Sequence, residues 1–215
     1  MEINVNQYIE FLLSENEKHN LISRQSGREE VLSHIEDSLA LLKFASLSGR
    51  RVVDIGSGAG FPALVLAMKC PDAEFVLLES DLKKSGFLQS CQERLALGNV
   101  QVLRLRAEEA GRDESLREQF DFCTSRAVAA VNIMLEYGLP LLKTKGRLLL
   151  WKGSNAAAEI EAAQNALRIL HGRVEAMHAY DLAGQRQRVI VAVKKEQATP
   201  PSYPRRTGIP GKKPL

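Results

Sequence analysis

Three glycines two residues apart, Gly56, Gly58 and Gly60, follow an apolar segment that contains Asp54. Glycine has no side chain, so a loop with this spacing lets a ligand approach the backbone closely. Residues 62–69 have helical character and follow directly, and the amide groups at a helix N-terminus favour negatively charged ligand groups. The order of strand, loop and helix predicts a nucleotide-binding loop.

The spacing of the glycines distinguishes between possible cofactors. A dinucleotide site has the pattern G-x-G-x-x-G, but the third glycine comes one residue early here and Phe61 occupies its slot. Asp54 would repel a pyrophosphate, whereas it suits a cofactor that carries an ammonium or a sulfonium group. The loop, with Ser57 in it, therefore predicts S-adenosylmethionine. A glycine-rich turn that only connects a strand to a helix is the alternative.

Polar residues also follow the next predicted strands. Glu79 ends the second strand, 23 residues after Gly56, where an acid can accept hydrogen bonds from both ribose hydroxyls; a surface glutamate is the alternative. Ala107 and Glu108 follow the third strand, where a backbone amide and a carboxylate could read the adenine edge. Arg126 follows the fourth strand, and a guanidinium there can hold a cofactor carboxylate or a substrate phosphate.

The elements that position these residues alternate between strands and helices from Arg50 onward. The expected strands are residues 52–55, 74–78, 100–105, 121–124, 147–151, 174–178 and 189–193, and the expected helices are 63–69, 83–97, 128–141 and 155–171, with a weaker pattern at 108–118. Short apolar runs of this kind suit a sheet covered on both faces. The fold class is therefore α/β, a doubly wound sheet of seven strands, and ligands bind beyond the carboxyl ends of such strands.

Two amphipathic helices are expected before this sheet, over residues 4–18 and 28–44. The second contains His34, Glu36 and Asp37 close together. Such a group could bind a metal, but adjacent acids point to different sides of a helix. A solvated or substrate-facing edge is the preferred interpretation, and we expect no metal site.

Length and composition limit the class of protein. A chain of 215 residues with 45% hydrophobic content can bury a full core, and it has no apolar run of 18 residues that would span a bilayer. The first residues lack the features of a secretory signal, which predicts a cytoplasmic protein. Cys70, Cys91 and Cys123 have no C-x-x-C spacing, so reduced core thiols are expected rather than disulfides or a zinc site.

Positive charge is concentrated at the end of the chain. Residues 194–215 hold six lysines and arginines against Glu196, a net charge of +5, so the rest of the chain carries −2 of the total of +3. Clustered cations are what contacts with a phosphate backbone require, and a solvated tail is the alternative.

Taken together, the motifs resemble the bacterial small-subunit rRNA guanine-N7 methyltransferase family, also called glucose-inhibited division protein B. They are residues 54–62, Lys83-Lys84-x-x-Phe87-Leu88, Asn99-Val100, residues 106–108, residues 125–127, residues 140–142, Lys152-Gly153 and residues 203–215. The resemblance runs from about Asn20 to the last residue. It implies a Rossmann-like class I methyltransferase that uses S-adenosylmethionine to methylate N7 of one guanine in 16S rRNA of the small ribosomal subunit. Truncation after Gln197 is then expected to spare cofactor binding and to lower RNA methylation and its salt sensitivity, because the deleted residues carry most of the clustered positive charge.

The resemblance also implies roles for single residues. Gly56 and Phe61 line the methionine and sulfonium part of the pocket, Ala107 and Glu108 border the adenine, and Arg126 closes the site as a positioning residue, with no general base. Together with the residues argued above from the loop and the strand ends, the full cofactor set is Asp54, Gly56, Ser57, Gly58, Gly60, Phe61, Glu79, Ala107, Glu108 and Arg126. The charge of the tail, rather than the resemblance, gives the RNA-binding set of Arg205, Arg206, Lys212 and Lys213. Ala63, Lys84 and Ser33 depart from the family pattern, and the last two remove guanidinium groups that are common there.

The expected organisation has three parts: an N-terminal helical extension (1–48), the methyltransferase domain (49–195) and a basic tail (196–215) that packs on or beside the domain. We expect a monomer. Two rival functions remain at this point. One is a class I methyltransferase that acts on a small molecule or a protein, and the other is a non-catalytic ribosome-assembly factor with a vestigial cofactor loop.

Overall fold

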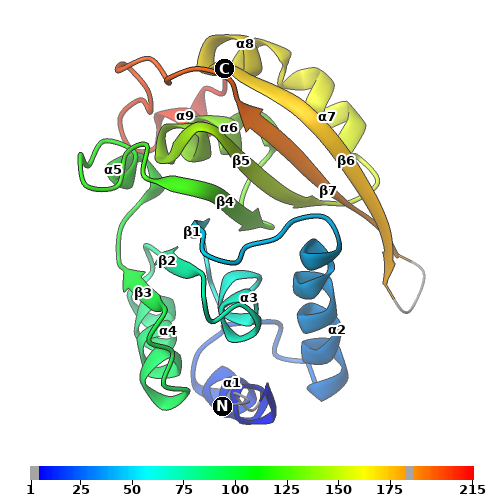
Figure 1. Cartoon of the computed structure of the whole chain (residues 1–215). Coiled ribbons are helices and arrows are strands. Elements are labelled where there is room, and N and C mark those ends of the chain that lie inside the picture. Colours follow the sequence, from blue (N-terminus) through cyan, green and yellow to red (C-terminus); the bar gives the residue numbers. More distant parts are fainter. Residues whose placement is uncertain (1–4, 183–185) are drawn as a thin grey trace.

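Among the residues that the structure describes, seven strands form one sheet in the order β3-β2-β1-β4-β5-β7-β6 (Figure 1). The computed structural model describes residues 5–182 and 186–215. The strands are β1 (Arg51–Ile55), β2 (Glu74–Leu78), β3 (Val100–Leu103), β4 (Phe120–Arg126), β5 (Leu142–Lys152), β6 (Gly172–Leu182) and β7 (Arg186–Lys195). β1 to β5 run parallel, and β7 is antiparallel to both of its neighbours. The strand order reverses between β1 and β4, so the predicted doubly wound sheet of seven strands is confirmed.

Helices cover both faces of the sheet. The α-helices are α1 (Val5–Lys18), α2 (Arg28–Leu39), α3 (Ala63–Lys69), α4 (Leu82–Arg94), α5 (Ala107–Ala110), α6 (Val131–Gly138), α7 (Ala156–Ala162), α8 (Gln164–Leu170) and α9 (Ile209–Lys212), with 3-10 turns η1 (Ala40–Lys43) after α2 and η2 (Leu139–Leu141) after α6. In Figure 1 the helices α1 to α4 lie on one side of the sheet and α6 to α8 on the other. This is the three-layer arrangement expected from the alternating elements.

Two predicted helices differ in the structure. The pattern at residues 155–171 forms two helices, α7 and α8, separated by the buried Ala163. The weak pattern at 108–118 forms only the short α5, which ends at Gly111. Beyond it, the Asp113 carboxylate accepts hydrogen bonds from both the backbone and the hydroxyl of Ser115, and such a local bond offers the backbone an alternative to a helix.

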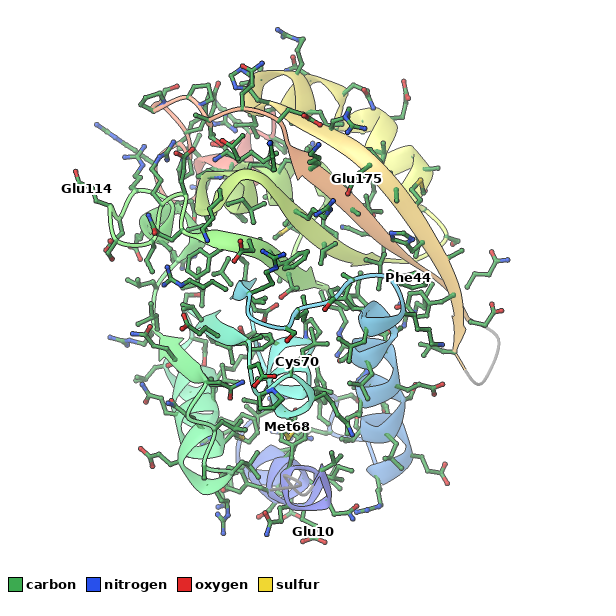
Figure 2. All side chains as sticks on the ribbon, viewed as in Figure 1. Glu10, Phe44, Met68, Cys70, Glu114 and Glu175 are labelled. Atoms are coloured by element: carbon green, nitrogen blue, oxygen red, sulfur yellow. The ribbon has the colours of Figure 1, made fainter. Side chains whose placement is uncertain are left out.

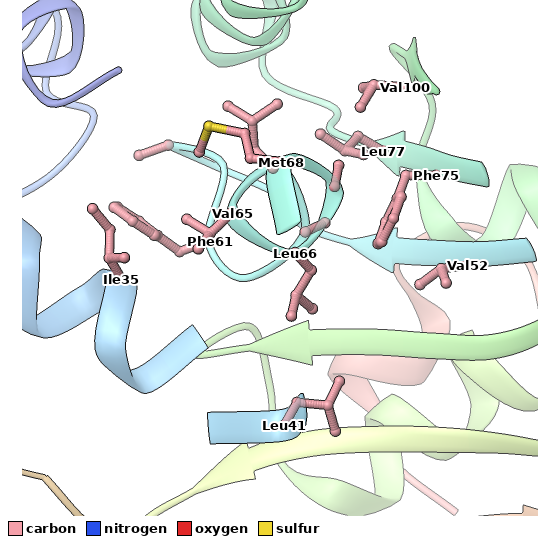
Figure 3. Close-up of a cluster of buried hydrophobic side chains, with 14 of the residues drawn as sticks. Ile35, Leu41, Val52, Phe61, Val65, Leu66, Met68, Phe75, Leu77 and Val100 are labelled. Atoms are coloured by element: carbon pink, nitrogen blue, oxygen red, sulfur yellow. The ribbon is translucent and has the colours of Figure 1, made fainter. Parts of the chain in front are cut away.

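The strands alternate their side chains between two hydrophobic clusters, one on each face of the sheet. In β1, for example, Val52 belongs to one cluster and Val53 to the other. Figure 3 shows part of the first cluster, in which Phe61 of the glycine-rich loop lies between Ile35 of α2 and Val65 of α3. The predicted loop is therefore built into the core at its far end.

The N-terminal helices share this core with the sheet. Tyr8, Ile9 and Leu12 of α1 are fully buried in the same cluster as Phe61. The Tyr8 hydroxyl donates a 2.7 Å hydrogen bond to the carbonyl of Ala59 in the middle of the loop. Helix α1 of the extension therefore holds the loop in position through this hydrogen bond and the shared core. In the part of the chain that the structure describes, no helix has both the length and the apolar character needed to cross a membrane.

Candidate functional site

The glycine-rich loop has a backbone that side chains would disrupt at two positions. Gly56 has a φ of +70° and Gly60 a φ of +101°, a region that residues with a Cβ rarely adopt. A Cβ on Gly56 would lie 2.5 Å from Cγ2 of Val128, and a Cβ on Gly60 would lie 2.9 Å from Cβ of Leu64. Gly56 follows the carboxyl end of β1, and the space that its side chain would need is filled by Val128.

Glu79 fixes the backbone of this loop at Gly58. Its carboxylate accepts hydrogen bonds from the amides of Gly58 (2.9 Å) and Asp81 (2.8 Å), one on each oxygen. The side chain is buried, although it directly follows β2 at the edge of a pocket. The alternative interpretation of Glu79 as a surface glutamate is therefore wrong. Each carboxylate oxygen has a further lone pair, so Glu79 can still accept hydrogen bonds from a ligand.

Asp54 is buried below the loop with half of its carboxylate unsatisfied. Its Oδ1 accepts a 2.6 Å hydrogen bond from the Thr124 hydroxyl. Its Oδ2 has no hydrogen-bond partner among the residues that the structure describes. Burial raises the pKa of this carboxyl from 3.8 to about 7, although the Thr124 hydrogen bond and the nearby Ser57 hydroxyl, which donates to the Asp54 backbone carbonyl, lower it. A buried acceptor without a partner is costly, and a ligand cation would remove that cost.

A pocket of about 180 Å³ brings four of the predicted residues together. Gly56, Glu79, Ala107 and Glu108 all line it, at the carboxyl ends of β1 and β2 and the start of α5; its other walls are Ile55, Leu78, Ser80, Leu105, Arg106, Val128 and Tyr137. Apolar walls with two carboxylates suit a flat ring and a sugar with hydroxyl donors. The residues thus fit the adenosine part of S-adenosylmethionine.

Arg126 lies beside the loop but is held by the N-terminal extension. Its Nη1 donates a 2.8 Å hydrogen bond to the Asp37 carboxylate, and its guanidinium carbon is 4.9 Å from the centre of the Phe61 ring. The His34 ring lies on the same phenyl ring, at 5.2 Å between centroids. Burial, and next the Arg126 charge, lower the pKa of His34, so this imidazole stays neutral at physiological pH.

The sequence predicts a solvated or substrate-facing edge at His34, Glu36 and Asp37, and the solvated alternative is wrong for Asp37. This side chain is only 3% exposed. Besides Arg126, it accepts a 2.6 Å hydrogen bond from the Tyr180 hydroxyl, and its backbone carbonyl accepts one from the Trp151 indole. Asp37 therefore joins α2 to the sheet. A charged residue inside an apolar helical face was the only signal of this in the sequence.

The four predicted RNA-binding residues fall into two groups in the structure. Arg206, Lys212 and Lys213 are exposed. Arg205 instead forms a two-point ion pair with Glu136 of α6, with Nε to Oε1 at 2.9 Å and Nη2 to Oε2 at 2.6 Å. The burial of Glu136 and its pairing with Arg205 were not predicted, because nothing in the local sequence pattern marks a carboxylate that is 1% exposed.

A second cavity lies away from these residues. It has a volume of about 610 Å³ and is lined by Leu41, Phe44, Lys143, Arg147 and Glu175, among others, beside the starts of β4 and β5. In Figure 2, Phe44 lies near the upper end of α2 and Glu175 lies on β6. The lining of this second cavity includes none of the predicted site residues. Across residues 5–182 and 186–215, the structure has no cluster of three or more histidine, cysteine or acidic side chains arranged to hold a metal ion.

Comparison with known proteins decides the family. The model of the family described as rRNA small subunit methyltransferase G matches residues 1–190. The chain belongs to this family. The rRNA small subunit methyltransferase G of Syntrophomonas wolfei is 60% identical over 215 residues and all of both chains. That of Desulfitobacterium hafniense is 43% identical over 209 residues, which cover 97% of this chain and 87% of the relative.

Solved structures agree on the fold. TYW2 from M. jannaschii, crystallised in complex with AdoMet, has a TM-score of 0.58 at 19% identity, covering 77% of this chain and 76% of that one. A precorrin-6y C5,15-methyltransferase from Geobacter metallireducens has a TM-score of 0.54 at 17% identity, covering 74% and 88%. At these identities the likeness shows the fold alone. The predicted Rossmann-like class I methyltransferase fold and the predicted rRNA small subunit methyltransferase G family are both confirmed.

The position of Glu79 leads to a first prediction about this family member. We expect Glu79→Ala to raise the Kd for S-adenosylmethionine roughly 10- to 150-fold, because charge-assisted hydrogen bonds contribute ~1.5–3 kcal/mol. Isothermal titration calorimetry measures this directly. Glu79→Gln keeps one acceptor for the Gly58 amide and should lose less.

The matched control for this prediction is Glu74→Ala. Glu74 starts the same strand, is exposed, and pairs only with Arg51 at 3.3 Å among the ion pairs of the described residues. Its removal should leave the Kd unchanged. If Glu79→Ala bound the cofactor as tightly as the wild type, the ribose assignment would be wrong.

Proposed function

We propose that this chain transfers a methyl group from S-adenosylmethionine to N7 of a specific guanine in 16S rRNA. The chain is an S-adenosylmethionine-dependent methyltransferase of small-subunit rRNA. The observation that carries the proposal is the full-length relationship to rRNA small subunit methyltransferase G proteins. The pocket between Gly56, Glu79, Ala107 and Glu108 supports it, because these residues fit an adenosine.

The proposed cofactor site extends from that pocket along the loop. Glu79 accepts from the ribose, while Ala107 and Glu108 border the adenine. Gly56, Ser57, Gly58 and Gly60 let the backbone approach the cofactor, and Phe61 lies beside its methionine part. Asp54 supplies a buried carboxylate beneath the loop, and its Oδ2, which has no hydrogen-bond partner among the described residues, is the group we assign to the ammonium. The positive charge there would complete a hydrogen-bonding set that the described residues leave incomplete.

The chemistry requires no general base. S-Adenosylmethionine supplies the methyl group on a sulfonium, so the N7–carbon bond forms as the sulfur–carbon bond breaks and the sulfur leaves as a thioether. Guanine N7 already carries an in-plane lone pair and holds no proton. The protein therefore acts by holding the two reactants in line, which can contribute ~7–11 kcal/mol. Arg126 has this positioning role, since Asp37 and Phe61 hold its guanidinium in one place.

The proposed substrate is the small ribosomal subunit or its 16S rRNA. Arg206, Lys212 and Lys213 are solvent-facing cations that can bind phosphates without reading sequence, and specificity then comes from the shape of the RNA. Arg205 contributes to RNA binding indirectly, because its bonds to Glu136 hold the chain that carries these three cations against the domain. Because its substrate is the ribosomal subunit or its rRNA, the enzyme acts in the cytoplasm. We propose that it acts there as a monomer. The division into 1–48, 49–195 and 196–215 is part of this proposal.

A methyl-transfer assay tests the proposed function. Labelled S-adenosylmethionine is incubated with intact small subunits, and separately with protein-free 16S rRNA, both from cells that lack this activity. We expect label in 7-methylguanine at one position, identified by nuclease digestion and mass spectrometry. Label on another base, on a protein or on a small metabolite would overturn the target assignment. Cofactor binding without transfer to either RNA substrate would favour the assembly-factor alternative.

A further inference from the structure

The C-terminal segment, residues 199–213, packs against the domain with one side. The Gly208 amide donates a 2.8 Å hydrogen bond to Oε1 of Glu108. Three residues earlier, the backbone amide and the guanidinium of Arg205 both bind the Glu136 carboxylate. Both acceptors are almost completely buried. In Figure 1 the red end of the chain accordingly lies beside α6.

A second set of contacts fixes the backbone of the segment. The guanidinium of Arg117 donates to the carbonyls of Thr199 (2.9 Å), Tyr203 (2.8 Å) and Gly111 (2.8 Å). Pro204 packs against Gly111, where a Cβ would lie 2.9 Å from the proline ring. One arginine thus joins the segment to the residue that ends α5. A solvated tail would have none of these bonds.

These contacts reach the wall of the candidate cofactor pocket. Glu108 and Tyr137 both line it. The Tyr137 hydroxyl faces Glu108, and burial, followed by the charge of this carboxylate, raises the pKa of the tyrosine to about 12. A Cβ on Gly211 would lie 3.9 Å from the same hydroxyl. The segment therefore contacts one residue of the pocket wall, Glu108, through a hydrogen bond and lies close to a second, Tyr137.

The opposite side of the segment carries exposed positive charge. Arg206, Lys212 and Lys213 are exposed, whereas Arg205 and Gly208 are partly buried. Arg205 and Arg206 are adjacent in sequence, but one binds Glu136 and the other faces solvent. A phosphate backbone that binds the outer cations would thus bind the same short stretch of chain that holds Glu108.

We propose that residues 199–213 couple RNA binding to cofactor binding, with Gly208 and Arg205 as positioning residues for Glu108. The inference rests on the proposed function for the identity of both ligands. RNA phosphates on the outer cations hold the segment against α5 and α6, which keeps Glu108 in place for the adenosine. Coupling between two sites is reciprocal, so S-adenosylmethionine strengthens RNA binding by the same factor. The expectation that a truncated chain keeps its cofactor affinity is replaced by this proposal.

The test measures the Kd of S-adenosylmethionine by calorimetry, with and without a saturating 16S rRNA fragment that contains the methylated guanine. For the wild type we expect the fragment to lower this Kd about 5-fold or more, within the usual range for coupled sites. Arg205→Ala detaches the segment and should raise the Kd without RNA while abolishing the effect of RNA. Arg205→Lys keeps one charge and should restore part of both.

Two controls separate positioning from loss of stability. Arg206→Ala removes an adjacent outward charge and should leave the Kd without RNA unchanged. Val174→Ala trims a core-facing side chain in the edge strand β6, so it should lower the Tm without changing cofactor affinity. In steady state, Arg205→Ala should raise the KM for S-adenosylmethionine more than it lowers kcat.

The coupling and the proposed function fail in different ways. An unchanged cofactor Kd in Arg205→Ala, in a protein that still methylates RNA, would overturn the coupling alone. An absence of any RNA effect on the wild-type Kd would also overturn it. A wild-type chain that binds no S-adenosylmethionine would instead overturn the proposed function.

Discussion

Replacing Asp37 by alanine is expected to lower the free energy of unfolding by about 3–5 kcal/mol, because it leaves a buried cation without its partner. The side chain is 3% exposed and binds both Arg126 and Tyr180. Without it, the Arg126 guanidinium stays over the Phe61 ring with no carboxylate beside it. Urea unfolding followed by circular dichroism measures the loss.

Glu36→Ala is the matched control for Asp37→Ala, since Glu36 is exposed on the same helix and surface changes of this kind stay within about 0.5 kcal/mol. In an Arg126→Ala background the cost of Asp37→Ala should be smaller by about 1 kcal/mol or more, because the two side chains act as a pair. A loss below about 1 kcal/mol in the wild-type background would mean that Asp37 does not join α2 to the sheet.

The loop and the strand ends could be predicted because their determinants are local. Three glycines at spacing two, followed by Phe61, require a backbone that only one part of this fold provides. Strand ends that carry Glu79 and Arg126 converge in any doubly wound sheet. Period-two and period-3.6 patterns located every strand and most helices, and the break at Ala163 was missed since both halves share the same pattern.

The partners of the site residues could not be predicted, because they lie far away in sequence. Arg126 binds a residue 89 positions earlier, and Asp37 binds a tyrosine 143 positions later. Composition alone gave Arg205 the same role as Arg206, although Glu136 is 69 residues away from it. Burial of a single charge depends on which elements meet, and local pattern does not contain that information.

Asp54→Asn is expected to stabilise the protein without cofactor, and more so at pH 8 than at pH 5. Burial raises the pKa of this carboxyl from 3.8 to about 7 in the folded chain. The stability that its protonated form contributes is complete below pH 3.8 and is lost as the pH rises to about 7. The amide has no such titration, and it keeps an oxygen that can accept from Thr124. The advantage of the variant should therefore grow by about 2–3 kcal/mol between pH 5 and pH 8.

Urea unfolding of both proteins at the two pH values measures this difference, with Asp72→Asn, an exposed acid in the turn before β2, as the control that should behave alike at both. The same carboxylate should favour the cofactor, because a cation beside Oδ2 removes the cost of its charge. S-Adenosylmethionine should thus raise the Tm of the wild type at pH 8 by more than it raises that of Asp54→Asn. An equal stability advantage of the variant at pH 5 and pH 8 would mean that Asp54 titrates as an ordinary acid. Burial would then not destabilise its carboxylate, and a ligand cation would have no such destabilisation to remove.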